Sequence, residues 1–521
     1  MPLERRSPRP GGKVDAKTSQ TVCSGDGMAC GMVIGNAVAH EHDVGVRQER
    51  SCQRSGGRDP RPRPRKPWRW RSYLVGRGWQ IGHPEFFAGK LSQQRGLRRR
   101  DDVTTTRVIW DVVVVGGGLA GLAAGVEVTA AGGRALVIEG HQPGGRARVT
   151  ERDGFIFNHG GHALYMGGPG LGVLRRHGIE PEGAKPPLRR YKMSREGRHH
   201  RFPCGPDTLL RTTILGARAK VQVGRLLAGL PRVDAARLAG TSVSAWLGDL
   251  GLRPDAEAVV RAVVRQGTYS SDQDDLDAGA AVNQLQLAVS DGVSYLHGGW
   301  AQLVEGLACR TQVRAGCKVR SLTPVAAGIE VTTDAGPLTA RAVVVAAGTP
   351  EAARSLLPDP PDWGDLGPPV TAACLDLGLD RIPSPGWVLG VDEPLYATLQ
   401  SPPAHMAPPG GAVAALIRYG ARNATADRAD LEAHARLAGI DPEAAAVSRF
   451  LARMVVAGAQ PRARLGGLAG RPAVTTTGHR AIAVCGDWVG PEGMLADAAL
   501  ASGAAAGRAA LDAARSATLA A

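Results

Sequence analysis

Three glycines and one acidic residue have the types and the spacing that bind a dinucleotide. Gly116-Gly-Gly-Leu-Ala-Gly121 follows an apolar run and opens a stretch of small residues. In such a loop Gly116 permits a tight turn, Gly118 lets the backbone approach a pyrophosphate, and Gly121 lets a helix pack closely against a strand. Glu139 follows 18 residues later, where an acid accepts hydrogen bonds from the adenosine ribose. The contacts predicted for this motif are Gly116, Gly118, Leu119, Ala120, Gly121 and Glu139.

The segments around these residues have the periodicity that the motif requires. Residues 107–115 are β-branched and continuously apolar, which is typical of a strand in the centre of a parallel sheet. Residues 119–131 favour a helix that ends at the glycine pair 132–133, and residues 134–138 form a second apolar strand. A strand, glycine loop, helix and strand in this order place phosphates at the positive end of the helix.

The residues after Glu139 resemble one family of flavoproteins. Gly144-Gly-Arg-Ala-Arg148 leads into Asp153-Gly-Phe-Ile-Phe-Asn-His-Gly-Gly-His-Ala-Leu-Tyr165. This is similar to the flavin amine oxidase, phytoene desaturase and protoporphyrinogen oxidase superfamily, whose members bind FAD. The resemblance implies that Gly145 and Arg146 lie along FAD. It also implies that Gly160 and Gly161 approach the flavin.

Two later segments resemble the same superfamily. Residues 298–308 are similar to its GG-x-x-x-L helix and lead to a strand, expected over 313–320, whose backbone near Val319 contacts the adenine. A hairpin and a buried strand ending at Gly348 follow. Near the C-terminus, a buried strand ends in Gly486-Asp487 before an Ala-rich helix. The resemblance assigns Gly486 and Asp487 to the ribityl or pyrophosphate part, and places the helix start at Leu495 and Ala496 beside the flavin.

Catalytic residues are few. His159 and His162, with Tyr165 close by, lie in the segment that the resemblance places near the flavin. One of them could move a proton or position substrate, although hydrogen bonding to backbone is the favoured role. No G-x-S-x-G or H-E-x-x-H motif occurs, which argues against a serine hydrolase and a zinc protease. No cysteine is placed like the covalent flavin cysteine of the monoamine oxidases in this superfamily, since Cys485 lies inside the strand before Gly486. The resemblance therefore implies non-covalent FAD. No metal site is expected.

Most of the net charge of +15 lies in one segment of the chain. Residues 1–100 hold 21 Lys and Arg against 8 Asp and Glu, whereas the rest holds 42 against 40. Residues 1–105 read as a basic disordered extension or as the product of a misassigned start, with Val103 as the true first residue. A tail that grips nucleic acid is a third reading, and no specific nucleic-acid partner is expected. The eight scattered cysteines favour reduced thiols in a cytoplasm.

The expected fold is α/β, with a discontinuous Rossmann-like FAD-binding domain and an inserted α+β substrate domain. The FAD-binding parts are predicted at 106–190, 292–350 and 472–521, and the substrate parts at 191–291 and 351–471. Residues 209–233 are basic and amphipathic, which suits either a solvated cap helix or peripheral membrane contact.

These observations predict an FAD-dependent oxidoreductase of the phytoene desaturase-like branch, moving a hydride from an apolar substrate to flavin N5. The alternatives are a flavin amine oxidase acting on a primary or secondary amine and a non-catalytic carrier of the same fold. The sequence leaves the electron acceptor open.

Overall fold

A mixed, mostly parallel sheet carries the glycine loop. The structure is a computed structural model that describes residues 109–519, so the basic N-terminal segment lies outside the described residues. The first sheet has the order β10-β2-β1-β13-β12-β11, with β19 paired to β13. Its strands are β1 (Ile109–Val115), β2 (Ala135–Ile138), β10 (Gln312–Arg314), β11 (Val319–Val325), β12 (Gly328–Thr333), β13 (Gly336–Val345) and β19 (Ile482–Val484).

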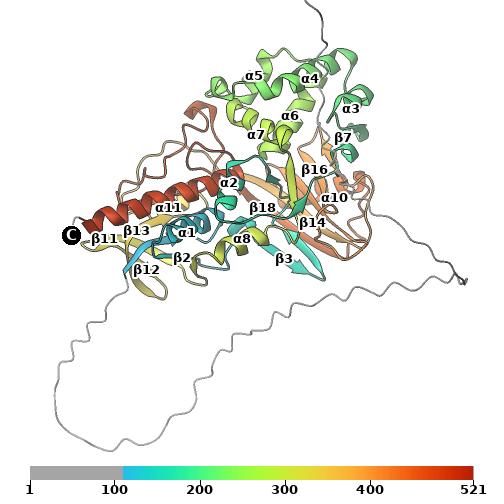
Figure 1. The fold of residues 1–521 in the computed structure, drawn as a ribbon. Helices are drawn as coiled ribbons and strands as arrows, with labels where there is room; N and C mark the ends of the chain where they lie inside the picture. Colours follow the sequence, from blue (N-terminus) through green and yellow to red (C-terminus); the bar gives the residue numbers. More distant parts are fainter. Residues whose placement is uncertain (1–108, 520–521) are drawn as a thin grey trace, which may run out of the picture. The chain divides into compact units, whose positions relative to one another are not determined.

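Both faces of the central strand β1 are buried, as its continuous apolar run predicts. Val112 and Val114 point to a layer of helices, whereas Val113 and Val115 point to the opposite core. The helices are α1 (Leu119–Ala130), α2 (Pro169–Arg176), α8 (Ala301–Ala308) and α11 (Leu495–Leu519). α11 lies along α1 over the strands (Figure 1). The other face packs against α9 (Pro350–Arg354) and the segment after it, which includes Trp363, and against Trp488, which follows β19.

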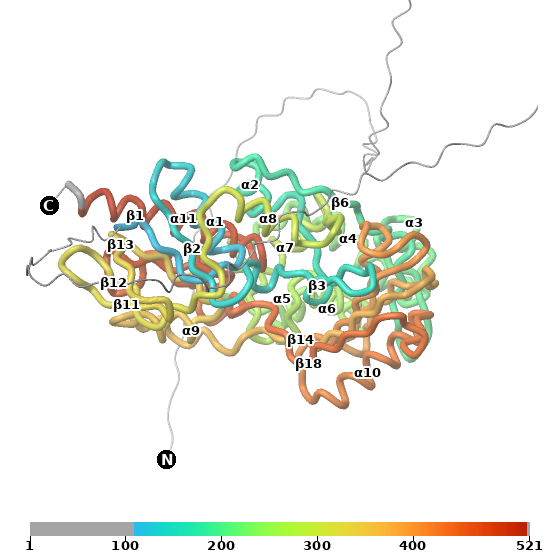
Figure 2. The backbone as a smooth tube through the Cα atoms, turned by 90° about the horizontal axis from the view of Figure 1, so that it is seen from below, coloured from blue at the N-terminus to red at the C-terminus, as the bar shows by residue number. Residues whose placement is uncertain are grey.

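A second, mostly antiparallel sheet has the order β18-β14-β17-β16-β15-β7-β8. Its strands are β7 (Lys192–Arg195), β8 (Arg198–Arg201), β14 (Val370–Leu379), β15 (Val388–Gly390), β16 (Leu395–Ser401), β17 (Ala412–Tyr419) and β18 (Val447–Ala457). Helix α10 (Ala424–Leu437) packs against β14, β16, β17 and β18. Figure 2 shows this sheet and α10 at the opposite end of the molecule from β11 and β12.

A group of helices lies over the second sheet in Figure 1. They are α3 (Pro206–Arg211), α4 (Ala217–Gly229), α5 (Val243–Asp249), α6 (Pro254–Thr268) and α7 (Ala278–Ser290). Short strands join the two regions: β3 (Val149–Arg152) pairs with β4 (Phe155–Asn158), and β9 (Val293–Leu296) pairs with β5 (Leu164–Tyr165) and β6 (Gly183–Ala184). Single 3₁₀ turns span Gly145–Ala147, Leu188–Arg190, Leu230–Arg232, Ala235–Leu238 and Ala463–Leu465.

The predicted strand–loop–helix–strand unit is confirmed, with α1 ending one residue before the predicted bound. Two details of the prediction were wrong. Residues 313–320 do not form one strand, because Gly316 at φ +67° turns the chain between β10 and β11. Residues 209–233 are not one helical stretch, because the chain leaves the helix at Thr212 and starts a new one at Ala217. The α/β class with a Rossmann-like sheet holds, and the domain boundaries stay predictions.

Candidate functional site

One cavity of about 780 Å³ collects most of the residues that the sequence singled out. It lies where the glycine loop, the start of α11 and strand β18 come together. Three predicted residues are absent from its lining, namely Gly121, Gly160 and Val319. The predicted residues that line it are Gly116, Gly118, Leu119, Ala120, Glu139, Gly145, Arg146, Gly161, His162, Tyr165, Gly486, Asp487, Leu495 and Ala496.

The glycine loop has the geometry that its sequence requires. Gly116 has φ +107°, and a Cβ there would lie 2.6 Å from the carbonyl oxygen of Ala346. A Cβ on Gly121 would lie 1.9 Å from the carbonyl oxygen of Gly116, so Gly121 is needed for close packing although it does not face the cavity. Gly118 differs, because no atom lies within 4 Å of a Cβ built on it. The backbone of Gly118 therefore borders open space, as the approach of a pyrophosphate requires.

Glu139 supports the loop directly. One of its carboxylate oxygens, Oε2, accepts a hydrogen bond from the Gly117 N–H at 2.7 Å, and Oε1 accepts one from the His141 N–H at 2.9 Å. Each oxygen keeps a lone pair that could accept a ribose hydroxyl. Val319 lies outside the cavity, but its neighbour Cys317 donates its N–H to the Glu139 carbonyl oxygen at 3.0 Å. The segment that the resemblance assigns to the adenine is thus placed beside Glu139.

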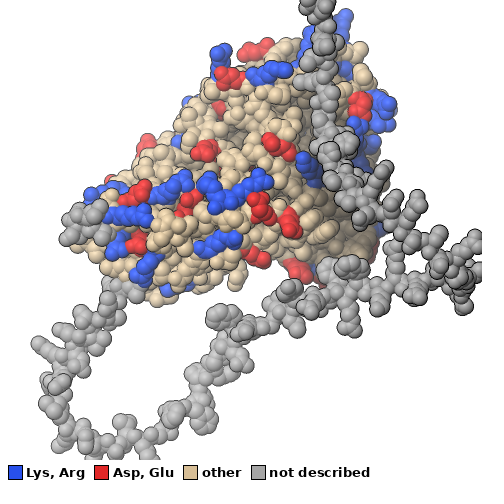
Figure 3. Space-filling view, in the orientation of Figure 1, with Lys and Arg blue, Asp and Glu red and all other residues tan. Residues whose placement is uncertain are grey.

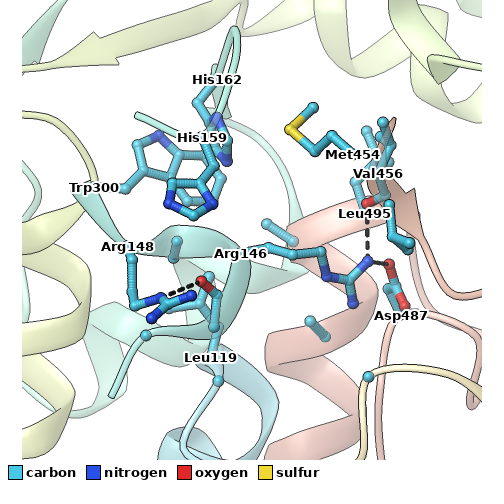
Figure 4. Close-up of a pocket in the computed structure, with 18 of the residues that line it drawn as sticks. Leu119, Arg146, Arg148, His159, His162, Trp300, Met454, Val456, Asp487 and Leu495 are labelled. Carbon is cyan, nitrogen blue, oxygen red and sulfur yellow. Dashed lines mark hydrogen bonds and ion pairs between the residues drawn. The ribbon is translucent and has the colours of Figure 1, made fainter. Parts of the chain in front are cut away.

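Arg146 and Asp487 form an ion pair across 341 positions of sequence. Nη1 of Arg146 donates to Oδ2 of Asp487 at 2.6 Å and to the carbonyl oxygen of Val456 at 2.8 Å, as Figure 4 shows. Burial acts to lower the pKa of Arg146, but the attraction of Asp487 outweighs it and raises the pKa. The other carboxylate oxygen of Asp487 accepts the N–H of Gly458 at 3.1 Å. This ion pair therefore joins three parts of the chain: the segment that contains Arg146, the C-terminal Gly486-Asp487 motif, and β18.

The start of α11 points its free N–H groups at the cavity. Leu495 has φ +55°, a left-handed conformation that costs a leucine energy, and strain of this kind concentrates at functional sites. The first N–H groups of a helix have no acceptor within the helix, so the cavity receives a positive dipole end at Leu495 and Ala496. Asp497 is only 2% exposed and accepts the Gly170 N–H at 2.9 Å. Burial raises the pKa of Asp497 to about 6, against this hydrogen bond, which lowers it.

His162 is held as a neutral ring. Its Nδ1 lies 3.1 Å from the Gly160 carbonyl oxygen, so Nδ1 carries the proton. Burial is the largest cause that lowers its pKa to about 4. The ring packs edge-on against Trp300, with ring centroids 4.7 Å apart. The backbone N–H of Trp300 donates to Asn158 Oδ1 at 2.9 Å, which fixes this pair against β4.

Two tyrosines line the cavity, and both hydroxyls are already used. Tyr165 donates to the Gly267 carbonyl oxygen at 2.9 Å, and Tyr269 donates to the Gly161 carbonyl oxygen at 2.8 Å. Burial raises the pKa of Tyr165 to about 12 and that of Tyr269 well above its usual value. At neutral pH these groups do not ionise, so they shape the cavity rather than exchange protons.

A buried ion pair supports the loop beneath His159 and Gly160. Nη2 of Arg449 donates to Oδ2 of Asp376 at 2.6 Å and also bonds the Asn158 carbonyl oxygen. Burial raises the pKa of Asp376 to about 6, although Arg449 acts to lower it. Arg449 also lowers the pKa of His159, after the larger effect of burial.

The sequence reasoning missed several lining residues. Phe450 to Val456 on β18 form one wall, and Tyr269 and Asp497 contribute two more side chains. β18 has no glycine signature, and Tyr269 follows an ordinary amphipathic helix, so neither carried a local signal. Asp497, two residues after the predicted helix start, could have been found by asking which acid follows the Gly-Asp motif.

These residues form a site for FAD. The glycine loop leaves space beside Gly118, Glu139 offers acceptors to a ribose, and the start of α11 offers a positive end to the flavin ring. The volume lies in the range of sites for large cofactors. Fold and site thus define a flavin-dependent oxidoreductase.

Comparisons with known proteins agree with the assignment to flavin-dependent oxidoreductases. The profile of the family described as "Flavin containing amine oxidoreductase" matches residues 119–378, and the chain belongs to the flavin amine oxidase superfamily. Among curated protein sequences none matches.

Solved structures share the fold. An oxidoreductase from Methanosarcina mazei has a TM-score of 0.58 at 16% identity, covering 75% of this chain and 98% of its own. Putrescine oxidase bound to putrescine has a TM-score of 0.57 at 17% identity, covering 77% and 98%. Cyclohexylamine oxidase from Brevibacterium oxydans has a TM-score of 0.58 at 16% identity, covering 78% and 99%. Identities this low establish the fold and leave the substrate open.

Within residues 109–519, no helix is both long and apolar enough to cross a membrane.

Proposed function

We propose that this FAD-dependent oxidoreductase removes a hydride from an apolar substrate, as in the phytoene desaturase-like branch. The observation that carries the proposal is the state of the polar groups near His162. The hydroxyls of Tyr165 and Tyr269 and the Nδ1–H of His162 all face backbone carbonyls. These three groups are therefore already paired within the protein, and Phe450, Leu451 and Met454 of β18 add apolar side chains to the lining.

The chain's own residues would then bind, orient and keep water away. Figure 4 places His162, Trp300 and Met454 on the far side of the cavity from Leu119. Arg146 and Asp487 would hold non-covalent FAD, which would supply the group that accepts the hydride. An apolar wall holds the reacting C–H bond in a dry and aligned position, which is the main contribution that such a reaction needs from the protein. His162, with its pKa of about 4, stays neutral and adds no charge.

A second candidate is oxidation of an amine, which the tyrosine pair favours. Tyr165 and Tyr269 come from distant segments to line the same cavity, an arrangement that the sequence did not reveal. Aromatic rings attract cationic or amine groups over their faces. One structural neighbour was solved with putrescine bound.

The experiment that separates the candidates is anaerobic bleaching of the flavin absorbance with a panel of amines, carotenoid precursors and porphyrinogens. Bleaching by polyenes and not by amines supports the proposal. Bleaching by amines alone, lost in Tyr269→Leu and kept in Tyr269→Phe, supports the second candidate, because phenylalanine keeps the ring. A yellow protein that no substrate class bleaches would contradict both candidates. Protein that stays colourless when FAD is supplied would favour the non-catalytic carrier, which could keep the glycines and bind no flavin.

A further inference from the structure

Large apolar side chains project into solvent from α3 and α4. Leu210, in α3, is 73% exposed, and Val221, in α4, is 53% exposed. Both are among the most exposed large apolar residues in the part of the chain that the structure describes. Exposed apolar residues in groups mark interaction surfaces more often than isolated ones do.

Arginines flank these side chains. Arg218, Val221 and Arg225 are spaced three and four residues apart, so they share one face of α4. Ala219 and Val223 lie on the opposite face and are buried in the core of the second sheet. We call the surface formed by Leu210, Arg211, Arg218, Val221 and Arg225 the α3–α4 face.

The two helices are joined into one surface. Nζ of Lys220 donates to the Leu210 carbonyl oxygen at 2.7 Å, and the side chain of Leu209 reaches Gly224. The first contact fixes the backbone of Leu210 beside α4. The exposed leucine and the arginines of α4 are therefore presented together.

The charge of this surface is unbalanced, although the body of the protein is nearly neutral. Residues 206–232 hold five Lys and Arg and one acid, Asp207, which pairs with Arg189. Arg211, Arg218 and Arg225 form no ion pair with another residue of the described part, 109–519. Figure 3 shows Lys and Arg side chains at the end of the molecule that carries α3 and α4.

We propose that the α3–α4 face docks on an anionic lipid bilayer. Leu210 and Val221 would enter the boundary between headgroups and acyl chains, and the three arginines would contact lipid phosphates. A nucleic acid would use the arginines but leaves the exposed leucine and valine without a role. A second copy of the chain would bring like charges together, which disfavours a symmetric dimer through this face.

The inference goes beyond the proposed function and does not depend on which substrate is oxidised. If the substrate is apolar, it dissolves in the bilayer, and docking through the α3–α4 face would bring the protein to it.

The test is co-sedimentation of the full chain with vesicles, comparing two variants of equal charge. Leu210→Glu/Val221→Glu changes the α3–α4 face. Ile382→Glu/Val325→Glu is the matched control, because these residues are 50% and 41% exposed and lie elsewhere. Both variants carry the same two added charges, so any binding by the basic N-terminal segment is weakened equally in each. The vesicles are phosphatidylcholine with about one third phosphatidylglycerol, and pure phosphatidylcholine serves as the neutral reference.

We expect the unaltered chain to bind the anionic vesicles, the Leu210→Glu/Val221→Glu variant to bind at least about tenfold less tightly, and the control to stay close to the unaltered chain. Arg218→Gln and Arg225→Gln should each weaken binding about fivefold. Equal binding by the two double variants would overturn the proposal. It would also fail if Arg218→Gln weakened binding of a duplex RNA and left vesicle binding unchanged.

Discussion

Substitution of single glycines tests whether a pyrophosphate lies beside the glycine loop. Gly118 is the test position, and Gly172 is the control. A Cβ on either would meet no atom within 4 Å, but Gly118 borders the cavity and Gly172 lies on the outside of α2. Gly118→Ala should fold, because its φ of −73° suits alanine, and should weaken FAD binding at least about tenfold by occupying the space of the pyrophosphate. Gly172→Ala should leave the affinity unchanged. Flavin fluorescence titration of both proteins measures the difference, and equal affinities would contradict a pyrophosphate beside Gly118.

Substitution of Arg146 tests the ion pair that joins its segment to the C-terminal Gly486-Asp487 motif. Arg146→Met leaves Asp487, which is only 2% exposed, without its partner, so we expect apoprotein stability to fall by about 2–3 kcal/mol and FAD affinity to drop. The double variant Arg146→Met/Asp487→Asn removes the uncompensated charge and keeps the acceptor for the Gly458 N–H. Urea unfolding should therefore show recovered stability, while FAD binding stays weak. Recovery of both would mean that Arg146 only neutralises Asp487.

At the scale of elements, Asp497 joins α11 to α2 and gives the fold a pH dependence. Its pKa is raised to about 6 from a usual value of 3.8, so folding favours the neutral acid. Its contribution is complete below pH 4 and is lost as the pH rises through about 6, reducing stability by up to about 3 kcal/mol. Asp497→Asn keeps an oxygen for the Gly170 N–H and should flatten this decline.

The measurement is the melting temperature between pH 4 and 8 for the unaltered chain, Asp497→Asn and Asp512→Asn. Asp512 lies on the exposed side of the same helix, so Asp512→Asn removes an equal charge without changing a buried group. Asp376 has a pKa raised to about 6 as well, so part of the decline should remain in every variant. Parallel profiles for the unaltered chain and Asp497→Asn would show that Asp497 does not titrate in this range.

The elements that could be predicted from sequence are those with local signals. β1, the loop and α1 follow one another within 22 residues, and each glycine there has a steric reason that operates over a few positions. The wall formed by β18 could not be predicted in this way, because it reaches the loop only through long-range pairing with β14. Tyr269 is a similar case, since its hydroxyl meets Gly161 across 108 positions. The C-terminal motif was placed by resemblance, and its contact with Arg146 emerged only in the folded chain.

At the scale of the whole molecule, the cavity lies between the two large sheets, so FAD should couple them. Gly116 follows β1 of the first sheet, and Met454 belongs to β18 of the second. A ligand that binds only the folded state adds about 2.7 kcal/mol at one hundred times its Kd. Calorimetry should therefore show one unfolding transition that moves upward with FAD concentration. Hydrogen exchange should slow at the start of α11 and along β18, and stay unchanged in β8, which does not line the cavity. Two transitions, of which FAD moves only one, would show that the second sheet forms no part of the cofactor site.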